Sequence, residues 1–230
     1  MQALKTLVLV HGFHLHAEAW EDVVWGDPQG GVFGRASRGI LEALACDATA
    51  IMFGTGTSEK DAVKEGDYTY RYAREHIGDL EQFAGKTADE LRVWLASRAY
   101  LELRSQDTRE EIEAALRYAQ ETGMQQLILV SSPTHIMRCQ QLALSLLSNN
   151  QDARGLRQHL YAVSSDVPYA GTTVDDVCII EPPHRPDRPN VRFDQTAKRL
   201  APFFKTMHAD IAEGFNAAWA LLVEEWKKKL

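Results

Sequence analysis

The chain has few cysteines and no long apolar run. Its 230 residues include three cysteines, Cys46, Cys139 and Cys178. Thiols that are few, odd in number and widely spaced fit a reducing compartment and argue against a disulfide framework. No apolar segment approaches the roughly 20 residues that a membrane-spanning helix needs. Residues 1–10 look like a short strand and lack the cleavage site of a secretory leader. We therefore expect a cytoplasmic protein with no membrane partner.

An excess of basic residues is also missing. Lysine and arginine number 25 against 32 acidic residues, which gives a formal net charge of −7 at pH 7. General nucleic-acid binders are normally basic, so we expect no nucleic-acid partner. Hydrophobic residues make up 45% of the chain and charged residues 25%, as is ordinary for a globular protein. The length suffices for one domain with a sizeable core.

The chain does contain a regular alternation of strands and helices. Short continuous apolar runs predict buried strands at residues 5–10, 48–53, 100–103, 127–130, 159–163 and 177–180. Helical spacing predicts helices from about residue 35 to 45 and within 61–83, 86–95 and 105–122. This alternation predicts an α/β fold: a Rossmann-like, doubly wound, mainly parallel sheet with helices on both faces.

The last part of the chain has one apolar stripe. Its members recur at helical spacing: Phe215, Ala218, Trp219, Leu222 and Trp226. We expect a single domain over residues 1–206, followed by a long amphipathic C-terminal helix over 207–230. That helix would pack on the domain or form the interface of a homodimer.

The strongest indication of function lies in residues 127–142, LILVSSPTHIMRCQQL. A buried strand is followed by Ser132-Pro133, a good N-cap and first residue for a helix. Ligands of open parallel sheets bind where strands end, and a helix start offers unpaired N–H groups to an anion. His135 falls in the first turn and Arg138 three residues on, so both can face one spot. This unit predicts an anion-binding pocket.

Polar or glycine-rich turns follow the first three predicted strands. In a parallel sheet they would share one edge with Ser131 and Ser132. The residues concerned are His11, Gly12, Gly54, Thr55, Gly56, Ser58, Glu59, Glu102, Ser105, Thr108 and Glu111. Glu59 and Glu102 could act as a general base, hold a ribose hydroxyl or bind a divalent cation, and each could equally be a solvated carboxylate. Ser105 and Thr108 could also be simple helix caps.

Three motifs carry a resemblance to a known family. They are GTGTSE at 54–59, LELRSQDTREE at 101–111 and VSSPTHIMR at 130–138. Their order resembles the DUF218 (ElyC/SanA/YdcF) family over roughly residues 5 to 165. The resemblance implies a Rossmann-like fold with a nucleotide-like ligand at the strand ends. It carries over Gly56, Ser58, Glu59, Glu102, Ser105, Thr108, Glu111, Ser131, His135 and Arg138. The chain departs from the family pattern at Thr55, where glycine is usual, and at Ile112, where asparagine is usual.

The glycine- and histidine-rich region 11–39 allows other interpretations. Its start resembles the oxyanion-hole segment of α/β-hydrolases, but the Gly-x-Ser-x-Gly elbow of that fold is missing. A zinc site of His11, His14, His16 and Glu18 would need an extended segment and a second cluster, so we expect no metal held by these residues. The simpler expectation is a ligand-covering loop with His11 and Gly12 at the pocket floor. Asp27, Arg35 and Arg38 could add ligand contacts or form surface ion pairs.

Two functions agree with these features. The first is an enzyme that hydrolyses, or transfers a group from, a phosphate-bearing nucleotide-like or sugar-like molecule, with a divalent cation as a further ligand partner. Arg138 and the N–H groups after Ser132 would hold the anion, His135 would donate a proton or stabilise charge, and Glu59 or Glu102 would be the base. The alternative is a non-catalytic module that binds a nucleotide-type ligand such as one like S-adenosyl-methionine. A weaker third hypothesis is a scaffold acting through the C-terminal helix.

Overall fold

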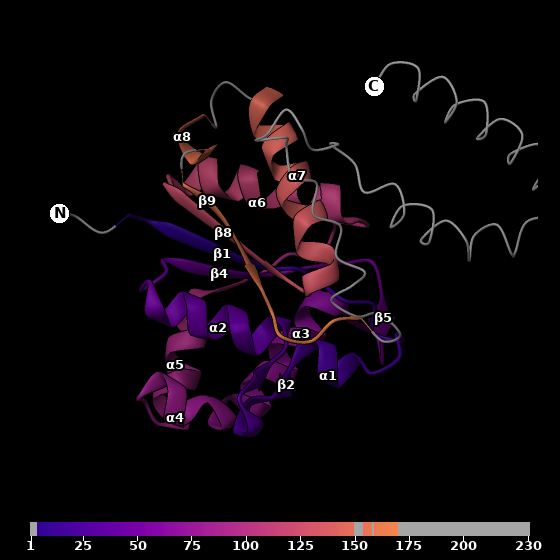
Figure 1. The fold of residues 1–230 in the computed structure, drawn as a ribbon, viewed down its shortest axis with the longest axis vertical. Helices are drawn as coiled ribbons and strands as arrows, with labels where there is room; N and C mark the ends of the chain where they lie inside the picture. The colour runs from indigo at the N-terminus through magenta and orange to yellow at the C-terminus, as the bar shows by residue number, and fades with distance from the viewer. Residues whose placement is uncertain (1–3, 150–153, 158, 170–230) are drawn as a thin grey trace, which may run out of the picture. The chain divides into compact units, whose positions relative to one another are not determined.

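The computed structural model describes residues 4–149, 154–157 and 159–169. Its centre is a five-stranded sheet in which all neighbouring strands are parallel (Figure 1). In spatial order the strands are β7 (Ala99–Leu101), β4 (Ala50–Phe53), β1 (Thr6–Val10), β8 (Gln126–Ser131) and β9 (Leu160–Ser164). The predicted α/β fold with a parallel sheet is confirmed.

The chain builds this sheet in two directions from β1. First β4 and β7 are added on one side, and then β8 and β9 on the other. The order therefore reverses between β1 and β8, and in open α/β sheets the crevice at such a reversal, outside the carboxyl ends of the strands, is where ligands bind. Val10 of β1 is paired with Val130 of β8, so His11 and Ser131 follow at the same level. We call this place, at the ends of β1 and β8, the switch point.

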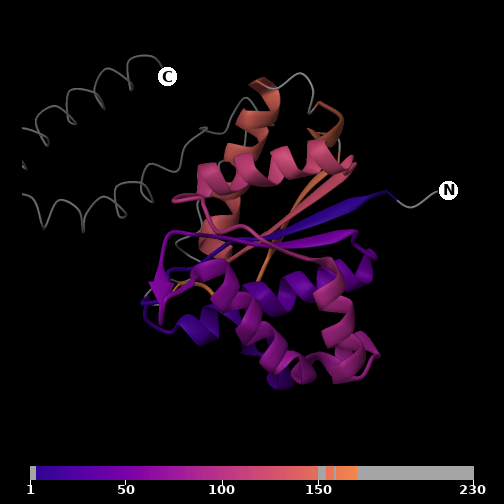
Figure 2. The ribbon, with the colours of Figure 1, turned by 180° about the vertical axis from the view of Figure 1, so that it is seen from behind.

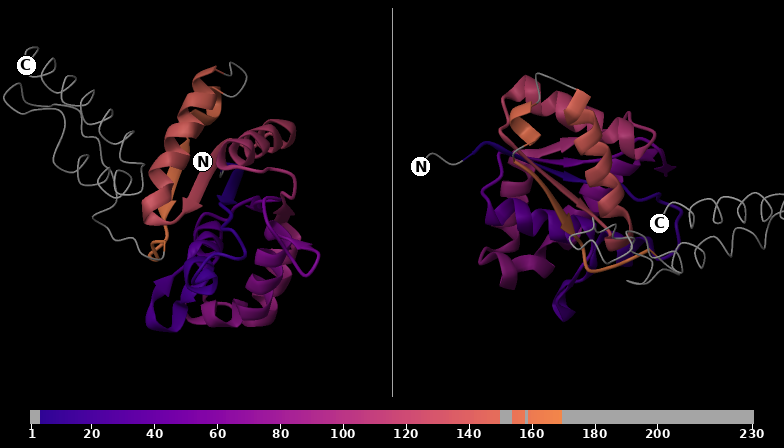
Figure 3. Two further views of the ribbon diagram at one scale, coloured as in Figure 1. Left: turned by 90° about the vertical axis from the view of Figure 1, so that its right-hand side faces the viewer. Right: turned by 45° about the horizontal axis from the view of Figure 1, so that its top comes forward.

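Helices cover both faces of the sheet, as the views from behind and from the side show (Figure 2, Figure 3). Successive strand residues point to opposite faces, so Val8 packs into one core cluster and Leu9 into the other. The first cluster includes residues of α1 (Trp20–Val24), α2 (Arg35–Ala45), α3 (Glu65–His76) and α5 (Ala88–Arg98). The second includes residues of α6 (Thr108–Thr122) and α7 (Pro133–Asn149).

Local sequence signals set several helix ends. Thr87 and Glu90 form both hydrogen bonds of a capping box at the start of α5. The Asp107 side chain accepts hydrogen bonds from two backbone N–H groups at the start of α6, and Gly123 ends this helix in the left-handed region at φ 69°. The predicted start of α7 at Pro133 is confirmed.

The prediction of one long loop from residue 11 to the start of α2 was wrong in its middle part. This region contains α1 and a small antiparallel pair, β2 (Gly26–Asp27) and β3 (Val32–Phe33), joined by the 3-10 helix η1 (Pro28–Gly30). The sequence of this region has no regular apolar pattern that would predict these elements. In α1 the buried residues are Trp20, Val23 and Val24.

The other short elements lie between the main ones. They are β5 (Glu59–Lys60), β6 (Val63–Lys64), η2 (Ile77–Leu80), α4 (Glu81–Ala84) and α8 (Arg154–Arg157). In the part of the chain that the structure describes, none of the helices has the length and apolar character that crossing a membrane requires. The predicted strand at 177–180, the boundary at 206, the C-terminal helix at 207–230 and Cys178 lie outside the described residues.

Candidate functional site

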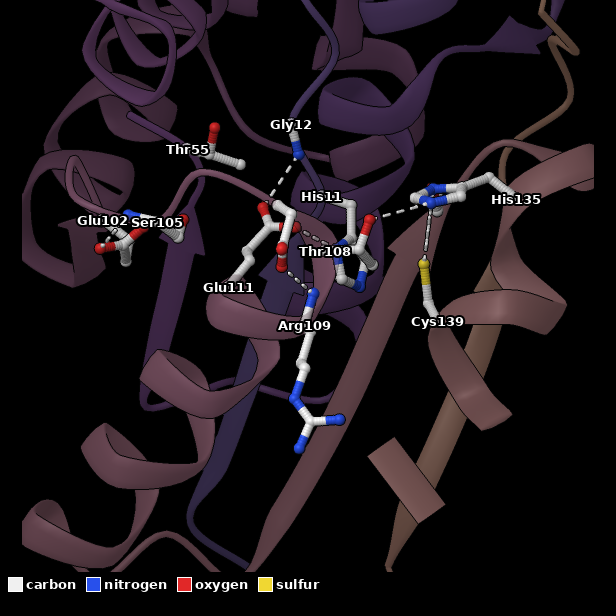
Figure 4. A network of polar contacts seen from close by, with 12 residues as sticks. His11, Gly12, Thr55, Glu102, Ser105, Thr108, Arg109, Glu111, His135 and Cys139 are labelled. Atoms are coloured by element: carbon white, nitrogen blue, oxygen red, sulfur yellow. Dashed lines mark hydrogen bonds and ion pairs between the residues drawn. The ribbon is translucent and has the colours of Figure 1, made fainter. Parts of the chain in front are cut away.

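Four turns meet at the carboxyl edge of the sheet, as the sequence predicts. His11 follows β1, Gly54 follows β4, Glu102 follows β7, and Ser131 ends β8 next to Ser132. Because these strands are parallel neighbours, the turns share one edge (Figure 4). Segments that are about 100 residues apart in the chain, such as those of His11 and Glu111, are in direct contact there.

The turn after β1 is held by a buried ion pair. His11 Nδ1 donates to Glu111 Oε2 at 2.5 Å, and Glu111 Oε1 accepts from the N–H of Gly12 at 3.0 Å (Figure 4). Burial alone lowers the pKa of His11, but the charge of Glu111 and the contact with Cys139 outweigh it and raise that pKa to about 10. His11 is therefore an imidazolium at neutral pH, paired with the first turn of α6.

Two glycines make room for the carboxylates of this edge. A Cβ atom at Gly54 would overlap Glu111 Oε1, and a Cβ atom at Gly12 would overlap Glu65 Oε1. Neither glycine has a positive φ, so space rather than backbone conformation requires them. The turns after β1 and β4 thus bring their backbone close to buried carboxylates.

Replacing Gly54 with alanine should lower the free energy of unfolding by about 1–3 kcal/mol, the usual range for forcing atoms into a packed interior. The added methyl must push Glu111 off His11. Urea unfolding of Gly54→Ala should show this loss. Gly78→Ala is the matched control, because its Cβ would lie 3.6 Å from the Cβ of Ala88, an ordinary contact. Equal losses in the two variants would contradict the account of Gly54.

A buried arginine lies at the switch point. Arg35, the first residue of α2, is 0% exposed. Its Nε donates to Ser132 Oγ at 2.8 Å, its Nη1 donates to the carbonyls of His11 and Gly12, and its Nη2 donates to the hydroxyl of Tyr169 at 2.6 Å. All these acceptors are uncharged groups, and Arg35 has no ion pair with any carboxylate of the described residues. A buried charge that forms no ion pair is unfavourable, so this guanidinium is suited to an anion.

Glu65 is a second buried ionisable group, and the sequence did not predict it as a site residue. It is the first residue of α3, and its Oε2 accepts from the hydroxyl of Ser58, which in turn accepts from the N–H of Leu15. Burial raises the pKa of Glu65, and the charge of Glu111 adds to this. The Ser58 hydrogen bond and Arg35 act against it, and the result is a pKa of about 7. Glu65 can therefore take up or release a proton near neutral pH.

His135 lies at the switch point, as predicted. Its Nδ1 is hydrogen-bonded to Ser131 Oγ at 2.9 Å, and its Nε2 to Thr108 Oγ1 at 3.2 Å. The Cys139 sulfur, one helical turn further along α7, is 3.4 Å from Nδ1 (Figure 4). The imidazole is thus fixed by β8, α6 and α7 together.

The surroundings of His135 keep it neutral. Burial lowers its pKa, and the nearby positive charges of Arg35, His11 and Arg138 lower it further, to about 3. At pH 7 the ring carries no charge and offers a single N–H. This favours hydrogen bonding over the proton donation or charge stabilisation that the sequence suggested for His135.

Three predicted residues are either exposed or engaged in internal hydrogen bonds. Arg138 is exposed and forms no hydrogen bond or ion pair with the described residues. Glu59 is on the exposed β5–β6 hairpin, where its carboxylate pairs with Lys64 at 2.8 Å. Glu102 is buried, but its carboxylate accepts from the N–H of Arg104 and from the N–H and hydroxyl of Ser105. The guanidinium at the switch point is that of Arg35, which the sequence analysis gave only as an optional contact.

The remaining predicted residues stabilise the edge by contacting each other. The N–H of Gly56 donates to the carbonyl of Ser105 at 3.0 Å, joining the turns after β4 and β7. Thr55 is buried, and its hydroxyl bonds to that of Thr57 at 2.8 Å. These contacts hold the turns after β4 and β7 together at the edge of the sheet.

Metal ligands do not gather in the described part of the chain, where no three His, Cys, Asp or Glu side chains lie close enough to hold an ion. The rings of His14 and His16 are 5.7 Å apart, but His16 Nε2 bonds to the carbonyl of Glu59. The carboxylates of Glu111 and Glu102 are already engaged in internal hydrogen bonds. We therefore assign no reaction step to a cation.

No protein-family model matches the sequence, and neither a curated protein nor a solved structure gives a match. The resemblance to the DUF218 family thus stays a prediction from the three motifs. The site itself combines a buried arginine, an imidazolium, a neutral histidine and a carboxyl group that titrates near neutrality.

Proposed function

We propose that the protein binds a phosphate-bearing, nucleotide-like or sugar-like small molecule at the switch point of a Rossmann-like sheet and catalyses hydrolysis or group transfer on it. The observation that carries this proposal is Arg35, a fully buried guanidinium with no carboxylate partner among the described residues. A phosphate would supply the missing charge, and guanidinium groups match phosphate oxygens in geometry.

Two buried polar atoms near the ends of β1 and β8 support an oxygen-rich ligand. His11 Nε2 and Thr134 Oγ1 have no hydrogen-bond partner among the described residues. Buried polar atoms of folded proteins are nearly always hydrogen-bonded. Phosphate oxygens could accept from the His11 imidazolium and from Thr134 in the first turn of α7. The start of this helix adds a partial positive charge.

Glu65 is the carboxyl group best suited to act as the base. A general base works best when its pKa is near the operating pH, and Glu65 has a pKa of about 7. Its carboxyl lies against the backbone of Gly12, next to the residues that would hold the anion. We therefore give Glu65 the role for which the sequence suggested Glu59 or Glu102.

The alternative is a module that binds a nucleotide-type ligand, for example one like S-adenosyl-methionine, without turnover. The engagement of Glu102 and Glu111 in internal hydrogen bonds favours this candidate, because neither carboxylate is left to react. Product formation decides between the two functions. The binding residues are the same in both.

Thermal unfolding with a panel of nucleotides, sugar phosphates and S-adenosyl-methionine tests the proposal. A ligand at 100 times its Kd stabilises a protein by about 2.7 kcal/mol. In a chain of this size that corresponds to a rise in Tm of roughly 5–10 °C. We expect such a rise in the wild type and in Arg98→Met, and its loss in Arg35→Met.

Arg98→Met is the control for this test, and variants of His135 and Arg138 extend it. Arg98 pairs with Asp47 at the opposite edge of the sheet, before β4 and β7 begin. His135→Ala should weaken the response, and Arg138→Ala should change it less than Arg35→Met, because Arg138 is exposed. An equal rise in Arg35→Met and wild type would refute the proposed site. Incubation of each stabilising ligand with the protein, followed by product analysis, separates an enzyme from a sensor.

A further inference from the structure

The segment after β9 extends to the switch point. The N–H of Ser165 donates to the carbonyl of Ser131 at 2.8 Å, which extends the pairing with β8 by one bond. Asp166 accepts from the N–H of Phe33 at 2.8 Å and pairs with Arg38 at 3.0 Å. These contacts fix the path of the segment just before Tyr169.

Tyr169 has both a ring contact and a polar contact at the proposed site. Its ring is stacked on Phe13, with centroids 5.2 Å apart and planes 11° apart, and its centroid is 6.0 Å from that of His135. The Cζ atom of Arg35 lies 5.0 Å from the centroid of the Tyr169 ring, and Arg35 also donates to the Tyr169 hydroxyl. A flat aromatic ring and an oxygen acceptor are therefore accommodated together beside Arg35.

These two features are also those of a nucleotide. The phenol oxygen accepts from Arg35 Nη2, the donor that a phosphate oxygen would use under the proposed function. The phenol ring covers Phe13, an aromatic face on which a base can stack. Stacking of a base on an aromatic side chain strengthens binding by roughly five-fold to more than one hundred-fold. A sugar phosphate could replace the oxygen contact but not the ring contact.

We infer that Tyr169 is an internal occupant of a nucleotide site and that a nucleoside monophosphate displaces it. The base takes the place of the phenol ring on Phe13, and the phosphate takes the place of the hydroxyl on Arg35. This inference rests on the proposed function and makes it more specific, because it selects nucleotides over sugar phosphates and names the side chain that competes with them.

Calorimetric titration of the full chain with the four 5′-mononucleotides, ribose 5-phosphate and inorganic phosphate tests the inference. We expect Tyr169→Ala to bind the preferred nucleotide about ten-fold or more tightly than the wild type, with a smaller gain for ribose 5-phosphate. Tyr169→Phe keeps the ring and removes the oxygen, so it should tighten phosphate more than the nucleotide. Phe13→Leu should weaken the nucleotide and leave ribose 5-phosphate unchanged. Tyr161→Ala, an exposed position on β9, is the control and should match the wild type.

The outcomes separate this inference from the proposed function. Weaker or unchanged nucleotide binding in Tyr169→Ala would overturn the inference, because the side chain would then be a wall of the site or a bystander. Equal binding of nucleotides and ribose 5-phosphate in every variant would also overturn it. In either case, binding that Arg35→Met abolishes would leave the proposed function standing. Binding unaffected by Arg35→Met, or no binding of any phosphate compound, would refute the proposed function itself.

Discussion

Replacing Glu111 with alanine is expected to lower the free energy of unfolding by about 3–5 kcal/mol at pH 6, the range found when one partner of a buried ion pair is removed. The substitution removes the counter-charge of His11, which is 2% exposed, so the buried ring must give up the proton that it keeps in the wild type. It also leaves the N–H of Gly12 without its acceptor. Urea unfolding of wild type and variant measures the loss.

The pH dependence of this loss has a definite sign. The pKa of His11 is raised in the folded protein from 6.5 to about 10. The stability that this provides is complete below pH 6.5 and disappears as the pH rises through 10. The deficit of Glu111→Ala should therefore shrink between pH 7 and 10, and NMR titration of the variant should find a much lower pKa for His11.

Glu113 provides a matched control on the same helix. Its carboxylate pairs with Arg109 at 2.9 Å, but the side chain is 44% exposed, and such surface pairs contribute at most about 1 kcal/mol. Glu113→Ala should thus lie close to the wild type. If Glu111→Ala were no less stable than Glu113→Ala, the buried pair could not be what holds the turn after β1.

The second large effect concerns Glu65. In the unfolded chain its carboxyl group loses its proton near pH 4.5, whereas in the folded protein it keeps the proton up to about pH 7. The contribution of Glu65 to the free energy of unfolding is therefore fully present below pH 4.5 and is lost as the pH rises to 7. Glutamine has no proton to lose. The advantage of Glu65→Gln over the wild type should grow across this window and reach about 3 kcal/mol above pH 7.

The test compares the stability of Glu65→Gln with that of the wild type at each pH, because titration of His135 changes stability in the opposite direction. Its pKa falls from 6.5 to about 3 on folding, so its contribution is present above pH 6.5 and is lost as the pH falls. Between pH 4.5 and 6.5 the two slopes oppose each other in the wild type. Unfolding curves of Glu65→Gln and wild type at several pH values remove the His135 contribution by subtraction. Glu59→Gln, an exposed position, should show no such trend, and a flat difference for Glu65→Gln would contradict the buried, protonated state.

The strands and helix ends could be predicted because their signals are local. The run from Leu127 to Val130 is buried on both faces, and Pro133 begins α7. The meeting of four turns at one edge followed from the parallel order alone. The elements within 20–33 could not be predicted in the same way, because they are short and depend on packing of Trp20 and Trp25 against α3.

The candidate site was predicted in place but not in all its residues. Arg35 is 97 positions away from Ser132, its hydrogen-bond partner, and no local pattern reveals such a contact. Glu65 stands in a charged segment, and only its position at a helix start hints at a special role. The spacing of three between His135 and Arg138, in contrast, predicts that both face one spot. The residue that α7 places against His135 is Cys139, four positions on, while Arg138 is turned to the surface.

Crystals soaked in sodium tungstate offer the most direct test of the central claim, that the switch point binds an anion through Arg35. Tungsten scatters anomalously, so its position can be located without a model of the anion. The account predicts a tungstate between the Arg35 guanidinium and the start of α7, with Tyr169 moved aside, and no tungstate there in Arg35→Met crystals. A tungstate found only on surface residues such as Arg138, or at the switch point of both proteins alike, would contradict it.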